Sequence, residues 1–197
     1  MHRKVFLLLA LLISVGLVIT ACAQGNNSAN TTVEKINRDE LVVAIGGEPE
    51  DGFDPTTGWG RYGSPLFQST LLKRDKDMNI INDLATAYEV SPDGLRWTVK
   101  IRNDVKFSDG EPLTAKDVAF TFNTAAQSGS VVDLSNLETT QALDEETVVF
   151  TLKEPQSTFI NLLISLGIVP EHAYDENYRE NPLGSGPYSF VQWDKGQ

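Results

Sequence analysis

The chain has 197 residues, a formal net charge of −11 and a single cysteine. This negative net charge argues against nucleic-acid partners and against electrostatic attraction to anionic lipid headgroups. One cysteine allows no intrachain disulfide, and two histidines leave little material for a Ser/His/Asp or Cys/His catalytic device, so the composition disfavours an enzyme.

The amino terminus resembles a bacterial lipoprotein signal. Basic residues precede an apolar segment, residues 5–19, which is short for a membrane-spanning helix. Residues 19–22, ITAC, match the lipobox pattern of an aliphatic residue, two small residues and cysteine. We expect residues 1–21 to be a cleaved signal peptide, Cys22 to carry a lipid anchor, and residues 22–39 to form a flexible tether. The alternative is an ordinary signal peptide with Cys22 present by chance.

The first part of the expected mature chain contains a strand and a long loop. Residues 41–45, LVVAI, form a continuous apolar run that predicts a buried strand. A glycine-rich loop follows over residues 46–65, and loops of this length in compact domains are usually functional or disordered. Four acids lie in this loop without EF-hand spacing, so we expect solvated side chains rather than a cation site. They are Glu48, Glu50, Asp51 and Asp54.

The middle of the chain alternates between strand and helix patterns. Alternation over residues 96–102 predicts a strand with its three apolar residues on one face. Thr114 is a suitable N-cap, with Asp117 in place of the capping-box glutamate, so a helix is predicted over residues 115–126. Further strands are predicted at residues 88–90, 105–107, 137–143, 147–152 and 188–193, and a helix at residues 158–165.

Three segments resemble the family 5 extracellular solute-binding proteins: residues 97–102 (WTVKIR), 105–118 (VKFSDGEPLTAKDV) and 181–191 (NPLGSGPYSFV). The resemblance implies an α/β fold of the periplasmic-binding-protein-like type II class. It also implies that this chain is an amino-terminal portion, an incomplete first lobe with an inserted α+β subdomain. The main lobe sheet would take residues 40–58 and 176–197, and the inserted subdomain residues 59–175.

The function implied by this resemblance is to bind a solute without catalysing a reaction. Such a protein binds a solute between two lobes and delivers it to the membrane subunits of an ABC importer. We expect a peptide ligand, no cofactor, and export to the membrane surface facing the periplasm or the cell exterior. Two alternatives stay open, namely a receptor for nickel or another solute, and a truncated surface lipoprotein or interaction module that binds no solute.

The resemblance also implies where the ligand would lie. The expected ligand-binding residues are Gly58, Trp59, Gly60, Arg61, Tyr62, Val131, Val132, Leu166 and Gly167. Glycine lets backbone amides approach a ligand closely, and a guanidinium can bind a carboxylate. The alternative for the two aromatic residues is that they hold the loop against its own lobe.

The remaining aromatic residues and the second histidine have simpler expected roles. Trp97, Phe107, Phe120 and Phe122 lie at periodic positions and are predicted to belong to the core. His172 follows Pro170-Glu171 and is predicted to be a surface residue rather than a ligand or a base.

Overall fold

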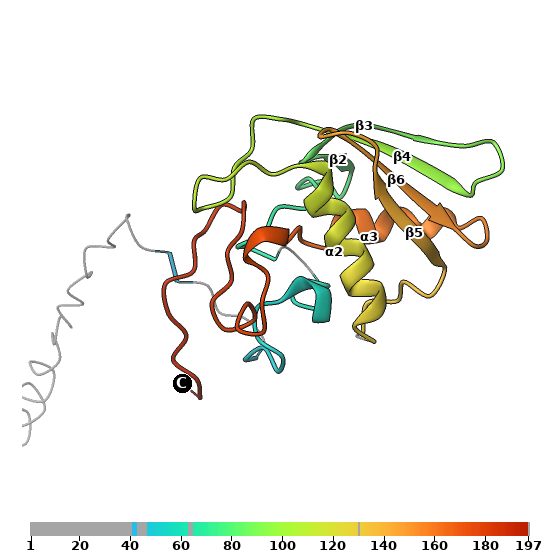
Figure 1. Cartoon of the computed structure of the whole chain (residues 1–197). Coiled ribbons are helices and arrows are strands. Elements are labelled where there is room, and N and C mark those ends of the chain that lie inside the picture. Colours follow the sequence, from blue (N-terminus) through green and yellow to red (C-terminus); the bar gives the residue numbers. More distant parts are fainter. Residues whose placement is uncertain (1–40, 43–46, 63–64, 130, 197) are drawn as a thin grey trace, which may run out of the picture. The chain divides into compact units, whose positions relative to one another are not determined.

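A computed structural model of the protein describes residues 41–42, 47–62, 65–129 and 131–196. The chain separates into two compact units, Met1–Ala44 and Ile45–Gln197, and the second contains every helix and strand named below (Figure 1). Helices and strands occur together in this unit, in agreement with the predicted α/β class.

The larger sheet of this unit is four-stranded and antiparallel, with the strand order β3-β4-β6-β5. Helix α2 (Ala115–Gln127) packs against one face of the sheet (Figure 1). The four strands are β3 (Ala85–Val90), β4 (Arg96–Ile101), β5 (Leu137–Ala142) and β6 (Thr147–Leu152). These four strands confirm the strands predicted at residues 88–90, 96–102, 137–143 and 147–152, although β3 is three residues longer than predicted. Helix α2 confirms the helix predicted over residues 115–126.

The alternation in β4 places its apolar side chains in the core. Trp97, Val99 and Ile101 are all buried, whereas the intervening side chains are exposed or half-buried. Trp97 lies opposite Phe150 of β6, and Val99 lies opposite Val148. Such cross-strand pairs on one buried face fix the register, because a slip of one residue would expose every member of the set.

Helix α2 begins where the sequence predicts. The backbone N–H of Thr114 donates to the Asp117 carboxylate at 2.8 Å, and the N–H of Asp117 donates to the carbonyl of Thr114 at 3.1 Å. These bonds satisfy donors that a helix start would otherwise leave unpaired. Phe122, on the inner face of α2, is fully buried with its ring centroid 4.7 Å from that of Phe150. Phe120 is only half-buried and contacts Tyr174 edge-on, so its predicted core position is only partly correct.

A β-hairpin and a second helix contribute to the same core. The hairpin pairs β1 (Leu72–Arg74) with β2 (Ile80–Asn82), and α3 (Ile160–Ser165) packs against β1. The predicted helix at residues 158–165 is confirmed, although its start is a 3₁₀ turn, η3 (Ser157–Phe159). Phe159 and Leu163 are its buried apolar side chains.

The glycine-rich loop is held by a buried carboxylate. Asp54 is 5% exposed and caps the 3₁₀ turn η2 (Pro55–Thr57). It accepts hydrogen bonds from the backbone N–H of Thr56 at 2.8 Å, the hydroxyl of Thr56 at 2.9 Å and the hydroxyl of Tyr174 at 2.7 Å. The prediction that Asp54 is a solvated loop acid is therefore wrong. Its hydrogen-bond partner Tyr174 is distant in the sequence, so no local pattern indicates that this carboxylate is buried.

Two short strands predicted from the sequence are absent from the described residues. Residues 105–107 form only a single bridge, between Lys106 and Pro112. Residues 188–193 have no regular secondary structure, and no described segment pairs with them. Leu41 and Val42 are exposed and irregular, and residues 43–45 of that predicted strand lie outside the described part of the chain.

Helices of the described residues are all short. The longest, α2, has 13 residues, and none has the length and apolar character that crossing a bilayer requires. The expected signal peptide, Cys22 and the tether lie outside the described residues.

Candidate ligand-binding site

Three segments that are far apart in the sequence meet around one hollow of about 310 Å³. The lining includes Trp59, Arg61 and Tyr62 from the glycine-rich loop, Val131 and Val132 from the segment after α2, and Leu166 at the end of α3. We call this the loop hollow. Six of the nine residues expected to bind ligand therefore lie together, which neither periodicity nor local spacing could establish.

The loop approaches residue 131 because position 58 is glycine. Gly58 has φ of 119°, a left-handed conformation that residues with side chains rarely adopt. A Cβ at this position would lie 2.6 Å from Cγ2 of Val131 and 2.9 Å from Nη1 of Arg61. Gly60, with φ of 78°, is similarly crowded by Pro65. Both glycines shape the wall of the loop hollow rather than forming part of its lining.

Trp59 anchors the loop. Its indole N–H donates to the carbonyl of Pro65 at 2.6 Å, and its ring lies edge-on to Phe53 at 4.8 Å between centroids. It also stacks at a longer distance on Phe67. The indole N–H is therefore used within the protein, which supports the alternative that this aromatic residue holds the loop in place.

Arg61 and Tyr62 are differently placed. Tyr62 is 90% exposed, so it does not anchor the loop. The Arg61 guanidinium lies over the Tyr62 ring, 4.5 Å from its centroid, in a cation–π contact. Both side chains can therefore be reached from solvent, and together they offer a charge and a flat apolar surface.

Leu166 and Gly167 form the base of this region. Leu166 is 2% exposed and lines the hollow with one side. Gly167 does not line it, since a Cβ there would lie within about 3 Å of Gln68, Pro65 and Pro55. Its lack of a side chain allows close packing under the loop.

A second, larger hollow of about 890 Å³ adjoins the first and was missed by sequence reasoning. We call it the hairpin hollow, because β1 contributes Lys73 and Arg74 to its lining. It shares Arg61, Tyr62 and Ser165 with the loop hollow. The one sequence signal that could have found it is the Lys73-Arg74 pair directly after the buried Leu71-Leu72, in a chain that is otherwise acidic.

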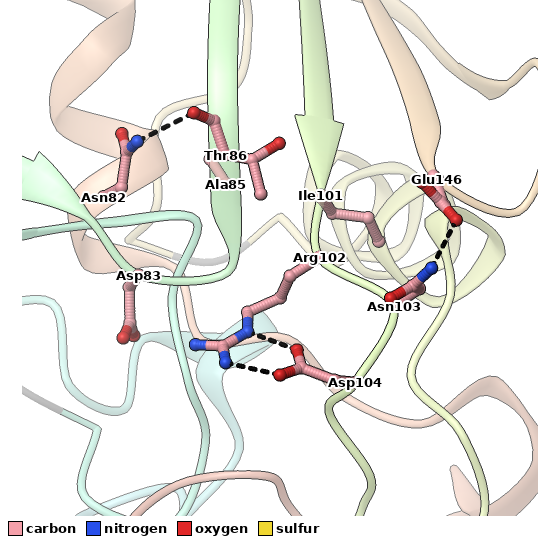
Figure 2. A pocket seen from close by; sticks show the side chains of 9 residues that line it. All are labelled: Asn82, Asp83, Ala85, Thr86, Ile101, Arg102, Asn103, Asp104 and Glu146. Carbon is pink, nitrogen blue, oxygen red and sulfur yellow. Dashed lines mark hydrogen bonds and ion pairs between the residues drawn. The ribbon is translucent and has the colours of Figure 1, made fainter.

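A third hollow, of about 690 Å³, lies where β4 ends (Figure 2). Figure 2 shows the Arg102 guanidinium forked onto the Asp104 carboxylate, and Asn103 donating to Glu146 at 2.8 Å. The ion pair holds the pKa of Asp104 below its usual range. The only cation of this lining is therefore already neutralised within the hollow, and its wall is acidic overall.

The Asp54 network that supports the loop has perturbed protonation equilibria. Burial raises the pKa of Tyr174 to about 12, and the hydrogen bond and charge of Asp54 act in the same direction. Burial likewise raises the pKa of Tyr178, whose hydroxyl accepts from Gln68 at 3.0 Å and donates to the carbonyl of Leu183 at 2.7 Å. Both phenols therefore stay protonated and donate hydrogen bonds at neutral pH.

No group of three or more metal-ligating side chains occurs among the described residues. His172 is exposed, in agreement with the prediction of a surface residue. Its Nε2 lies 2.7 Å from a carboxylate oxygen of Asp109, and this hydrogen bond lowers the pKa of Asp109. The pair connects two surface segments.

Comparison with known proteins identifies the family. The profile of the bacterial extracellular solute-binding proteins, family 5 (middle region), matches residues 79–197. The chain belongs to this family. A putative ABC transporter peptide-binding protein from Brucella ovis is 36% identical over 160 residues, which cover 73% of this chain and 30% of that protein.

Solved structures show the same fold for this member of family 5. NikZ from Campylobacter jejuni, in complex with Ni(L-His), matches with a TM-score of 0.74 and 29% identity over 82% of this chain and 34% of its own. The oligopeptide-binding protein AppA from Bacillus subtilis, in complex with a nonapeptide, matches with a TM-score of 0.62 and 31% identity over 67% of this chain and 29% of its own. The fold is therefore the type II periplasmic-binding-protein fold, and the chain spans about a third of the length of these relatives.

Proposed function

We propose that this family 5 protein is the ligand-capturing part of an ABC importer's substrate-binding protein, and that its ligand is a peptide. The observation that carries the proposal is the convergence of the loop, the segment after α2 and the end of α3 on the loop hollow. The hollow offers an exposed phenol, a guanidinium and apolar valine side chains. These groups suit a peptide backbone with its carboxylate, and none of them suggests covalent chemistry, so we propose no enzymatic activity.

The glycine-rich loop and the carboxyl-terminal part support the proposed division into a main lobe and an inserted subdomain. The backbone N–H of Phe53 donates to the carbonyl of Arg179 at 2.8 Å, and Trp193 Nε1 donates to Glu48 at 2.8 Å. Segments 40–58 and 176–197 would form the main lobe, around the subdomain of residues 59–175. In this proposal a second lobe closes over the loop hollow, so we expect this chain alone to bind peptide weakly.

We also propose that Cys22 anchors the protein to the membrane through lipid, facing the periplasm or the cell exterior. The support is the lipobox pattern at residues 19–22. Metabolic labelling with a fatty acid tests it, with Cys22→Ser as the control. Loss of label in Cys22→Ser is the expected result, and equal labelling of the two proteins would contradict the anchor.

Peptide binding is tested by titrating the ¹⁵N-labelled mature chain, residues 22–197, with tri-alanine at millimolar concentration. We expect amide shifts that map to Gly58, Arg61, Val131 and Leu166. Val131 is 61% exposed and lines the hollow, whereas Val191 is 89% exposed and lines no described hollow. Val131→Lys should abolish the shifts and Val191→Lys should preserve them. Shifts that are absent, or that persist in Val131→Lys, would overturn the proposal.

A nickel chelate is the second candidate, because the NikZ structure contains Ni(L-His). A titration with nickel–histidine under the same conditions separates the two ligands. Specific broadening around the loop hollow by the chelate, without shifts from tri-alanine, would replace peptide by metal chelate as the proposed ligand.

A further inference from the structure

The hairpin hollow has an unusual charge for this protein. Of the described residues that line it, Arg61, Lys73 and Arg74 are basic and Asp83 is acidic. The chain as a whole carries a formal charge of −11. The hollow of Figure 2 has the opposite balance, with Arg102 outnumbered by three acids. A basic cavity in an acidic protein creates a local field that favours anions.

Two of these cations are available for a ligand. Lys73 is paired with Asp83 at 2.9 Å. Neither Arg61 nor Arg74 forms an ion pair with any acid in the described part of the chain. Arg74 donates to the carbonyl of Met78 at 2.9 Å and lies 3.4 Å from Oδ1 of Asn161, which leaves several of its five N–H groups unused.

Two residues that line the hairpin hollow have a buried oxygen atom without a hydrogen-bond partner among the described residues. Gln68 is 1% exposed, and its Oε1 has no hydrogen-bond partner among the described residues. The hydroxyl oxygen of Ser185 is likewise buried without a partner in this part of the chain. Buried polar atoms are normally satisfied, and these two oxygen atoms have almost no accessible surface, so the charge of the hollow rather than these atoms would select the ligand.

We propose that the hairpin hollow binds the acidic side chain of a peptide, with Arg61 and Arg74 as the residues that recognise its carboxylate. This inference rests on the proposed function, because it extends the ligand from the loop hollow into the adjoining one. Arg61 lines both hollows. In this proposal, a peptide bound beside Arg61 in the loop hollow presents the neighbouring side chain to the hairpin hollow. The receptor then selects acidic peptides, although the protein itself is acidic.

The test compares Ala-Glu-Ala with Ala-Gln-Ala by ¹⁵N chemical-shift titration of residues 22–197. We expect the acidic peptide to bind about tenfold more tightly, because one charge-assisted hydrogen bond contributes a gain in affinity of about this size. The preference should decline with added salt. Arg74→Glu should remove the preference and Arg74→Lys should retain most of it. Lys116→Glu, which makes the same charge change on the exposed side of α2, should leave it unaltered.

Each outcome separates this inference from the proposed function. Equal affinity for the two peptides in the unaltered chain would overturn the inference while peptide capture stands. An equal loss of preference in Lys116→Glu and Arg74→Glu would overturn the assignment to the hairpin hollow. Succinate binding as tightly as Ala-Glu-Ala, with no binding of Ala-Gln-Ala, would overturn the peptide and leave an organic acid as the ligand.

Discussion

Replacing Asp54 with alanine should destabilise the protein more than its position in a loop suggests. The carboxylate is 5% exposed and accepts three hydrogen bonds, two from Thr56 and one from Tyr174. The change therefore removes the N-cap of η2 and leaves buried donors without an acceptor. Asp51, three residues earlier, is exposed and serves as the matched control.

The magnitude follows from these contacts. Loss of an N-cap costs about 1 kcal/mol, and loss of a buried hydrogen bond to a charged group costs about 1.5–3 kcal/mol. The Tyr174 hydroxyl also lies 2.8 Å from the hydroxyl of Thr56. In Asp54→Ala, the Tyr174 hydroxyl can donate its hydrogen bond to the Thr56 oxygen instead of to the carboxylate. This replacement partner moves the total toward the lower end of the range, so we expect a loss of about 2.5 kcal/mol in the free energy of unfolding.

Urea denaturation of Asp54→Ala and Asp51→Ala measures the difference. With a slope of about 2 kcal/mol per molar urea, the midpoint of Asp54→Ala should fall by roughly 1 M with the slope unchanged. Asp51→Ala should stay within about 0.5 kcal/mol of the parent protein, as surface substitutions do. Equal, small effects of the two substitutions would refute the reasoning that Asp54 is a buried structural carboxylate.

Three further predictions concern the site, the core and the pH dependence. Gly58→Ala should cost about 1–3 kcal/mol and abolish peptide-induced shifts, because φ is 119° and the new Cβ would meet Val131; parent-like stability and binding would contradict this. Phe122→Ala should cost about 3–5 kcal/mol in urea denaturation, and a loss below about 1 kcal/mol would contradict its place in the core. The pKa of Tyr174 is raised from 10.0 to about 12 on folding, so its contribution is complete below pH 10 and is lost as the pH rises toward 12. Stability curves of the parent and of Tyr174→Phe should therefore converge over that interval, and parallel curves would contradict the shift.

Elements with a local signal could be predicted from the sequence. The strand β4 alternates over successive residues, and the start of α2 depends on Thr114 and Asp117, which are three residues apart. Both are confirmed because the information that specifies them lies within one turn or one strand. The same holds for Trp97, Phe107 and Phe122 in the core.

Features that depend on distant partners could not be predicted this way. Asp54 is buried because Tyr174, 120 residues later, donates to it. The hairpin hollow combines residues of β1, of α3 and of the segment around Ser185, which no local pattern connects. The strand expected at residues 188–193 has the right alternation, but a strand also needs a hydrogen-bonded partner, and no described segment provides one. The loop hollow was predicted only through the family resemblance, and its ligand stays a prediction.

The central claim, that a peptide lies in the loop hollow, is tested most directly by paramagnetic broadening. A nitroxide-labelled tripeptide added to ¹⁵N-labelled residues 22–197 should broaden the amide signals of Gly58, Val131 and Leu166, which line or border the hollow. Signals of the β5–β6 connection around Glu145 should stay sharp, and reduction of the nitroxide should restore the broadened ones. Uniform broadening, or broadening centred on the hollow of Figure 2, would contradict the account.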